Sequence, residues 1–185
     1  SDHFILYEDV FIEKIKKALD FTAANDALVT LGITPTRPDT GYGYIQYASE
    51  AANGVHKVLH FREKPDLEKA KVFLAEGNYV WNAGIFIWKA ESILRALNTH
   101  SKEIYDLFNN GTEIYNTEGE RSFIDEHYPT SPNISIDYAI MEQADNVYTI
   151  PAEFGWSDLG TWASLYEAAP KNEENSVISG KQVYT

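Results

Sequence analysis

Apolar residues recur along this chain at two alternating spacings, which predict helices and strands in turn. Residues 8–25 carry apolar side chains at the spacing of one helix face, whereas 27–33 are almost all apolar, as in a strand covered on both faces. The same pattern predicts further helices over 66–76, 90–98, 101–109, 119–127, 135–144 and 161–169. It predicts further strands over 44–48, 55–61, 84–88 and 147–151, with Asn53-Gly54 as the turn between the second and third strands.

Alternating helices and strands are typical of an α/β domain built around a mixed sheet. The chain has no internal repeat and no low-complexity linker, so we expect one domain over residues 1–170. After Pro170 the sequence becomes polar and then strand-like over 177–183. We interpret residues 171–185 as an exit segment toward a following domain or tail.

Composition narrows the function classes. The 185 residues carry a formal net charge of −13, which argues against a partner made of nucleic acid, because such binding needs a basic surface. A nucleotide or sugar phosphate stays possible, since a few local cations suffice. The absence of cysteine excludes disulfides, thiolate metal sites and a cysteine nucleophile. No apolar run reaches the length of a membrane span and no signal peptide opens the chain, so we expect no membrane partner and a cytoplasmic location.

Common chemical motifs are missing from the sequence. There is no phosphate-binding loop ending in Gly-Lys-Ser/Thr, and the stretch GYGYIQ has too few glycines for a dinucleotide fingerprint. The five histidines are scattered without the spacing of metal ligands. The candidates for chemistry are therefore four clusters in predicted loops.

Two of these clusters precede the middle of the chain. In PTRPDTGYGYI, Gly41 and Gly43 flank Tyr42 and allow the backbone to approach a ligand, although a tight connection between strands explains them too. In HFREKP, Lys64 could neutralise a phosphate and Glu63 could accept hydrogen bonds from sugar hydroxyls. The alternative for HFREKP is a charged strand end before a helix.

The other two clusters are VWNAGIF and FGWSDLGTW. Asn82 stands between a bulky aromatic and a small pair at the mouth of a predicted strand, where its amide could bind a polyol or be satisfied by backbone. Asp158 precedes a predicted helix, so it is either a helix cap or a carboxylate ligand for Mg²⁺. A magnesium site needs a second carboxylate, which Asp2 could supply.

Taken in order, the motifs SDHFI, PTRPDTGYGYI, FREKP, VWNAGIFIW, SIDYAIME and WSDLGTW resemble those of bacterial mannose-1-phosphate guanylyltransferases, within the nucleotide-sugar pyrophosphorylases. The resemblance spans nearly the whole chain. It implies a Rossmann-like nucleotide-diphospho-sugar transferase fold. It also implies transfer of GMP from GTP to mannose 1-phosphate, which gives GDP-mannose and pyrophosphate. The sugar phosphate attacks the α-phosphorus of GTP directly, so no protein nucleophile is required.

The resemblance also implies roles for individual residues. Asp2 and Asp158 would hold the Mg²⁺ that bridges the phosphates, and Lys64 would act with them in catalysis by gripping the phosphate of mannose 1-phosphate. The substrate-binding residues that it implies are Gly41, Tyr42, Gly43, Glu63, Lys64, Asn82 and Asp137.

Two departures from the family pattern qualify this interpretation. The family's glycine-rich, arginine-containing loop, which cradles the GTP phosphates, is not in this chain. We therefore expect the chain to be the C-terminal part of the catalytic domain and to be inactive by itself. We also expect a homo-oligomer in which a second copy covers an apolar sheet edge. Arg62 stands where the family usually has a small apolar residue.

Two other functions remain as alternatives to a mannose-1-phosphate guanylyltransferase. One is another sugar-1-phosphate nucleotidyltransferase, for example one for glucose 1-phosphate, and the other is a non-catalytic sugar-phosphate-binding module.

Overall fold

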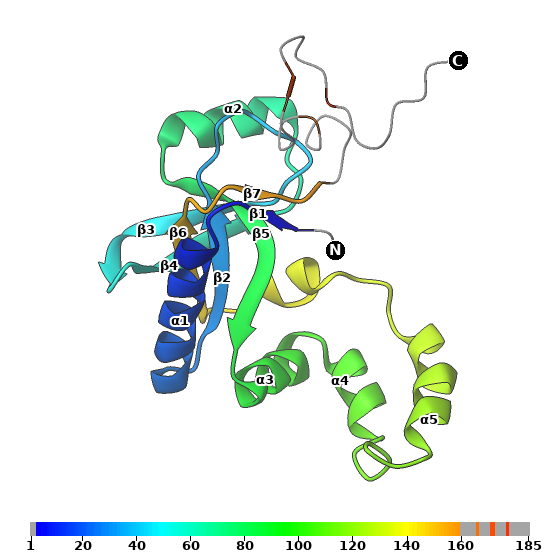
Figure 1. Ribbon diagram of the computed structural model, residues 1–185. Coiled ribbons are helices and arrows are strands. Elements are labelled where there is room, and N and C mark those ends of the chain that lie inside the picture. Colours follow the sequence, from blue (N-terminus) through cyan, green and yellow to red (C-terminus); the bar gives the residue numbers. More distant parts are fainter. Residues whose placement is uncertain (1–2, 160–165, 167–170, 173–176, 178–185) are drawn as a thin grey trace, which may run out of the picture.

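The computed structural model describes residues 3–159, 166, 171, 172 and 177, and Figure 1 shows their arrangement. The strands are β1 (Phe4–Ile5), β2 (Leu28–Ile33), β3 (Tyr44–Ala52), β4 (Val55–Arg62), β5 (Tyr79–Trp88), β6 (Val147–Ala152) and β7 (Trp156–Ser157). The helices are α1 (Glu8–Ala24), α2 (Leu67–Glu76), α3 (Ala90–His100), α4 (Lys102–Asn109) and α5 (Glu120–His127), with a 3₁₀ turn at Tyr128–Thr130 and a π-helical turn at Asp137–Met141.

Five of the strands form a mixed sheet that closes on itself in the order β2-β5-β3-β4-β6. Strand β2 runs parallel to β6, and the other four pairings are antiparallel. The predicted mixed α/β architecture is thus confirmed, whereas the closure was not predicted. Because each strand of this closed sheet has a neighbour on both sides, the sheet does not offer, among the described residues, the open edge on which the expected self-association rested. Self-association itself stays a prediction.

Strand β2 is buried on both faces, which explains its nearly continuous apolar sequence. Val29 and Leu31 point into a cluster formed with α1, whereas Leu28 belongs to a second cluster on the opposite side, formed with α3 and the π-helical turn. A strand between two apolar layers has no solvent face, so apolar and polar residues do not alternate along it.

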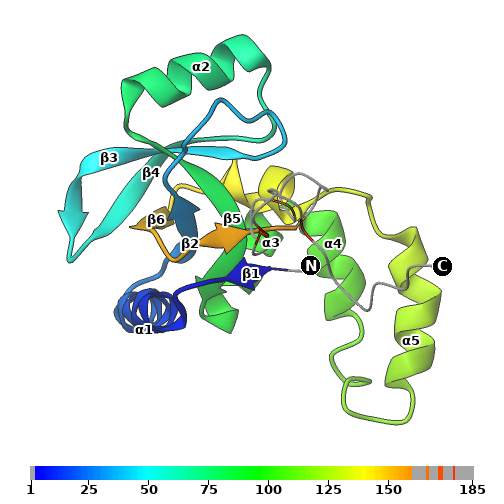
Figure 2. The ribbon, with the colours of Figure 1, turned by 45° about the horizontal axis from the view of Figure 1, so that its top comes forward.

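The helices cover different sides of the closed sheet (Figure 1). Helix α1 lies along β2. Helix α2 packs on a third buried cluster, which is mainly aromatic, through Phe73, which lies against Tyr44 and Tyr79. In both views α4 and α5 lie to one side, away from the strands (Figure 2). Among the described residues, no helix is both long enough and apolar enough to cross a bilayer.

Local chemistry fixes several boundaries where the sequence predicted them. Asp66 caps α2 by accepting a hydrogen bond from the Lys69 backbone N–H at 2.9 Å, and Gly77 ends the helix in the left-handed conformation with φ of 72°. Asn53 and Gly54 both have positive φ, 54° and 75°, as a two-residue hairpin turn between β3 and β4 requires.

Some predicted elements differ in the structure, and others lie outside the described residues. Strand β5 begins at Tyr79, five residues before the predicted start, because residues 79–81 pair with β3. Asn82 therefore lies within a strand and not at its mouth. The predicted helix over 135–144 is one π-helical turn at Asp137–Met141. The predicted helix over 161–169 and the exit segment 171–185 fall largely outside the described residues.

Gly32 provides a test of this packing. A methyl group added at Gly32 would overlap the Val80 side chain and lie 2.9 Å from Thr149 Oγ1. We expect Gly32→Ala to destabilise the fold by roughly 1–3 kcal/mol, the usual cost of overpacking a core. Urea unfolding measures this cost.

The matched control for Gly32→Ala is the same change in a Val80→Ala background, where the nearest overlapping atom, the Val80 Cγ2 methyl group, is gone. The cost of Gly32→Ala should be smaller there, since the two positions share one space. An equal cost in both backgrounds would show that the close approach of β2 to Val80 is not the cause.

Candidate functional site

The loop between β2 and β3 takes its shape from Asp39. One carboxylate oxygen of Asp39 accepts a hydrogen bond from the Gly41 N–H at 2.8 Å, and the other pairs with the Arg37 guanidinium at 2.9 Å. The Asp39 carbonyl accepts a hydrogen bond from the Tyr44 hydroxyl at 2.9 Å. These contacts hold the Gly41–Gly43 stretch in one conformation beside the sheet.

Gly43 is the point of closest approach between three of the predicted motifs. A side chain at this position would overlap the Glu63 carboxylate, and its Cβ would lie 3.4 Å from Asn82 Cβ. The Asn82 backbone N–H donates to the Gly43 carbonyl at 2.8 Å. Glycine therefore leaves the space that the Glu63 carboxylate occupies next to this loop, and a larger residue would push the end of that side chain aside.

The Asn82 side chain is held from both ends. Its Oδ1 accepts hydrogen bonds from the Thr30 hydroxyl and from the Gly84 N–H, both at 3.1 Å, and its Nδ2 donates to Asp137 Oδ1 at 3.0 Å. The β2–β5 register shifts between Thr30 and Gly32, and Gly84 has φ of 67°. A bulge in β5 thus turns the Gly84 N–H toward the amide of Asn82, as bulges beside functional sites often do.

Glu63 and Lys64 follow β4 and face the same site. The Glu63 side chain is buried to all but 13% of its surface, whereas 63% of the Lys64 side chain is exposed, with Nζ 3.4 Å from Glu63 Oε1. Burial raises the pKa of Glu63, and the nearby charge of Asp137 raises it further, while Lys64 opposes the rise. Lys64 has φ of 43°, a conformation that costs energy for a residue with a side chain.

Tyr42 links the loop to Asp158. Its hydroxyl donates to Asp158 Oδ1 at 3.1 Å, and its ring packs on Trp81 and Trp156 with centroid distances of 5.0 and 5.4 Å. Burial and then the charge of Asp158 raise the pKa of Tyr42 to about 12. The hydroxyl therefore keeps its proton over the physiological range and remains a hydrogen-bond donor.

Asp158 follows β7, which pairs antiparallel with β1, Phe4 lying opposite Ser157. The residues just after Asp2 therefore lie beside those just before Asp158, although Asp2 itself is outside the described residues. Within 3–159 and the four further residues described, no three His, Asp or Glu side chains form a group suited to a metal ion.

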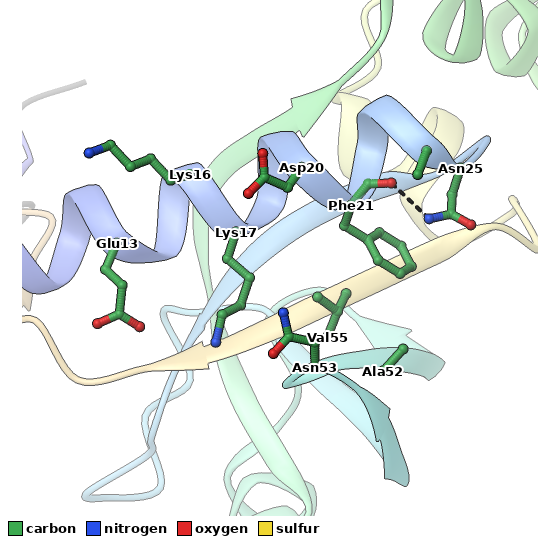
Figure 3. A pocket seen from close by; sticks show the side chains of 10 residues that line it. Glu13, Lys16, Lys17, Asp20, Phe21, Asn25, Ala52, Asn53 and Val55 are labelled. Atoms are coloured by element: carbon green, nitrogen blue, oxygen red, sulfur yellow. Dashed lines mark hydrogen bonds between the residues drawn. The ribbon is translucent and has the colours of Figure 1, made fainter.

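A separate hollow of about 450 Å³ lies between α1 and the β3–β4 turn, with Lys17 reaching toward Asn53 (Figure 3). None of the predicted site residues that the structure describes lines it. The polar cluster around Asn82 is thus a different place from this hollow.

A family model described as nucleotidyl transferase matches residues 1–175 of the sequence. The chain belongs to the nucleotidyl transferase family. This assignment agrees with the resemblance that the six sequence motifs indicated.

Individual members of the nucleotidyl transferase family resemble the chain over nearly its full length. Mannose-1-phosphate guanylyltransferase RfbM of Salmonella typhimurium is 38% identical over 97% of the chain, and mannose-1-phosphate guanylyltransferase of Sinorhizobium fredii is also 38% identical over 97%. The chain spans 38% and 35% of the lengths of these two relatives. The solved mannose-1-phosphate geranyltransferase of Thermus thermophilus superposes with a TM-score of 0.80 at 28% identity, covering 90% of this chain and 47% of that one.

The structure brings four of the predicted residues of this nucleotidyl transferase chain into one cluster, namely Gly43, Glu63, Asn82 and Asp137. Lys64 lies at the exposed rim of this cluster. Tyr42 and Asp158 form a neighbouring pair, and Gly41 is bound to Asp39. Which of these residues touch a substrate or a metal stays a prediction.

Two contacts of the site were missed from the sequence. Thr30 orients Asn82, and its only signal was a hydroxyl residue inside an apolar strand. Glu142 accepts a hydrogen bond from the Glu63 backbone N–H at 3.3 Å. It stands at the end of SIDYAIME, a motif from which only Asp137 was singled out, and helical spacing gave no reason to place both carboxylates on one side.

The raised pKa of Glu63 leads to a prediction about stability. A carboxyl group whose pKa is higher in the folded protein opposes folding when it is ionised, so its cost is absent below its ordinary value of 4.5 and present at neutral pH. Glu63→Gln should therefore raise the melting temperature at pH 7 by about 2–4 °C, a usual size for a modest change in a chain of this length. The rise should vanish as the pH approaches 4.

Glu68→Gln on α2 is the control for Glu63→Gln, because 82% of its side chain is exposed. It should produce no comparable rise at pH 7. A lower melting temperature for Glu63→Gln at neutral pH would mean that Lys64 outweighs burial and Asp137 in setting the energy of this carboxylate.

Proposed function

We propose that this chain forms the sugar-phosphate and metal side of a mannose-1-phosphate guanylyltransferase site. In this reaction GMP passes from GTP to mannose 1-phosphate, giving GDP-mannose and pyrophosphate. On this proposal residues 1–170 are the C-terminal part of the catalytic domain, and the substrates are mannose 1-phosphate and GTP. The family assignment and the printed names of the relatives support the reaction class.

The observation that carries the proposal is the convergence on Gly43. Glu63, Asn82 and Asp137 offer carboxylate and amide groups within one half-buried cluster, and Lys64 stands at its rim. Acceptors and donors gathered in this way suit the hydroxyl groups of a sugar, and a cation at the edge suits its phosphate. Lys64 is largely exposed and pairs with the adjacent Glu63, so its ammonium group can reach a bound anion.

The chemistry requires little of the protein beyond positioning. A phosphate oxygen of mannose 1-phosphate forms a bond to the α-phosphorus of GTP, and the bond to the pyrophosphate oxygen breaks. Because the attacking oxygen is already ionised, no side chain has to remove a proton. Both reactants are anions, so Lys64 contributes by neutralising charge on the attacking phosphate and by fixing its direction.

The donor set also suits a divalent ion, for which we propose Mg²⁺. Asp158 supplies a carboxylate whose Oδ1 is oriented by the Tyr42 hydroxyl, and the β1–β7 pairing brings the neighbours of Asp2 alongside. A bound Mg²⁺ would neutralise charge on the transferred phosphates and hold them in line. Asp158 and Asp2 are the residues that would hold the ion, with Tyr42 fixing one of the two carboxylates.

Lys64→Met tests the phosphate role in the full-length protein. Methionine keeps most of the aliphatic stem but loses a charge-assisted hydrogen bond, which is worth roughly 1.5–3 kcal/mol, or about ten- to over a hundredfold in a rate or binding constant. We expect kcat/KM for mannose 1-phosphate to fall by that factor, with the KM for GTP changed far less. Steady-state kinetics with both substrates varied measures both effects.

Lys69→Met is the matched control for Lys64→Met. Lys69 is about as exposed as Lys64, 67% against 63%, and likewise pairs with a neighbouring carboxylate, that of Asp66. It should leave both KM values unchanged. A Lys64→Met enzyme with a raised KM for GTP and a normal one for mannose 1-phosphate would contradict the assignment of Lys64.

Asp158→Asn tests the metal role in the full-length protein. An asparagine oxygen can still accept the Tyr42 hydrogen bond, so the melting temperature should change little. Loss of the charge should lower activity at least about tenfold and raise the Mg²⁺ concentration needed for half-maximal rate. Tyr42→Phe, which keeps the carboxylate, should have the smaller effect on Mg²⁺ dependence. Normal activity combined with a large loss of stability would make Asp158 a purely structural residue.

The expectations of a cytoplasmic location and of a homo-oligomer belong to this proposal as well. They rest on the composition of the chain and on the family resemblance. Size-exclusion chromatography with light scattering measures the oligomeric state directly.

A further inference from the structure

The π-helical turn at Asp137–Met141 is the least regular helical element of the fold. Its defining hydrogen bond runs from the Glu142 N–H to the Asp137 carbonyl, five residues back, at 2.9 Å. The bonds on either side have shorter spans, from Ala139 to Ser135 and from Ala144 to Ile140. Single π turns are rare in proteins and are found frequently at functional sites, so this turn calls for a physical explanation.

The π turn changes which side chains share a face. On an α-helix five residues advance roughly 1.4 turns, so side chains that far apart point in different directions. A hydrogen bond from residue i+5 to residue i instead places Glu142 above Asp137. Both carboxylates then face the sheet, where Asp137 accepts from Asn82 Nδ2 at 3.0 Å and Glu142 accepts from the Glu63 N–H at 3.3 Å.

The residues between the two carboxylates anchor the turn. Ala139, Ile140 and Met141 are buried, with exposed fractions of 5%, 0% and 2%. They pack in the same cluster as Phe61 of β4 and Val80 of β5. The backbone that carries Asp137 and Glu142 is therefore fixed to the two strands whose residues lead into the site at Glu63 and Asn82.

The backbone N–H of Glu63 needs a hydrogen-bond acceptor such as Glu142, because the next residue, Lys64, has a strained backbone conformation. Strand β4 ends at Arg62, Lys64 adopts φ of 43°, and Pro65 follows. A left-handed residue costs about 1–2 kcal/mol and persists only where the surroundings hold it. The Glu142 carboxylate supplies an acceptor for the backbone N–H that leaves the strand ladder at this point.

We infer that Glu142 is a positioning residue, which holds the Glu63–Lys64 turn in its left-handed form so that both side chains face one ligand. It does so through the backbone of Glu63 and without contact to the substrate. The inference deepens the function proposed above and depends on it for the role of Lys64. The contact between Glu142 and the Glu63 N–H does not depend on that function.

The test compares Glu142→Leu with Glu142→Gln. Leucine removes the acceptor, whereas glutamine keeps an oxygen that can accept the same N–H. In the full-length protein, Glu142→Leu should lower kcat/KM for mannose 1-phosphate about three- to tenfold, the range of one hydrogen bond, and leave the KM for GTP alone. Glu142→Gln should restore most of the loss. Gln143→Leu, the same apolar change at the exposed adjacent residue, is the control and should have no such effect.

Coupling to Lys64 separates positioning from a general structural role. If Glu142 acts through the turn, Glu142→Leu should lower kcat/KM less in a Lys64→Met background than in the unchanged protein, because only the position of Glu63 is then left to be lost. Fully additive losses would overturn the inference. If Lys64→Met itself left the kinetics of mannose 1-phosphate unchanged, the proposed function would fail instead, and the amide measurement below would still decide whether Glu142 holds the turn.

Hydrogen exchange of the Glu63 amide provides a readout independent of activity. Its protection should be retained in Glu142→Gln and lost in Glu142→Leu, while the Ile150 amide in the buried strand β6 stays protected and shows that the fold is intact. Unchanged protection of the Glu63 amide in Glu142→Leu would overturn the inference. So would faster exchange of that amide accompanied by unchanged kinetics, because the turn would then not position the substrate groups.

Discussion

The amide of Asn82 is the interaction on which the rest of the site depends. Through its side chain and backbone it joins β2, the Gly43 loop, the bulge of β5 and the π turn, with Thr30 and Asp137 as its side-chain partners. An amide can do this because it carries an acceptor and two donors on one rigid plane. Aspartate at this place would set a second carboxylate against Asp137 instead of a donor, and leucine would remove both the acceptor for the Gly84 N–H and the donor to Asp137, so the residue type follows from these contacts as much as from any ligand.

Two adjacent residues of the site, Glu63 and Lys64, each oppose folding in a different way. Glu63 is a carboxylate in a partly buried place beside Asp137, and Lys64 holds a backbone conformation that glycine would adopt at lower cost. The fold holds both between Phe61, which is buried near the end of β4, and the capped helix α2 that follows. Strain and unfavourable charge gathered at one turn are typical of places where function, and not stability, selects the residue.

Sequence reasoning succeeded where the controlling chemistry is local. The ends of α2 follow from Asp66 and Gly77, and the β3–β4 turn follows from Asn53-Gly54, because each signal acts within a few residues. Sequence reasoning failed where residues distant in the chain determine how a strand begins or pairs. The early start of β5 depends on pairing with β3, and the closure of the sheet depends on β6 meeting both β2 and β4. The motif resemblance pointed to the candidate residues, whose roles stay predictions, but the place of Asn82 inside a strand and the contact of Glu142 needed the tertiary structure.

The packing of Tyr42 on Trp81 and Trp156 has an optical consequence. Trp81 belongs to the closed sheet and Trp156 to the small β1–β7 sheet, so a single loop residue joins the two through aromatic contact. The fluorescence emission of an indole ring changes with the polarity of its surroundings and with the distance to neighbouring groups. The chain has four tryptophans, and two of them flank the tyrosine that holds Asp158. The emission of Trp81 and Trp156 should therefore depend on how closely the two sheets are held together.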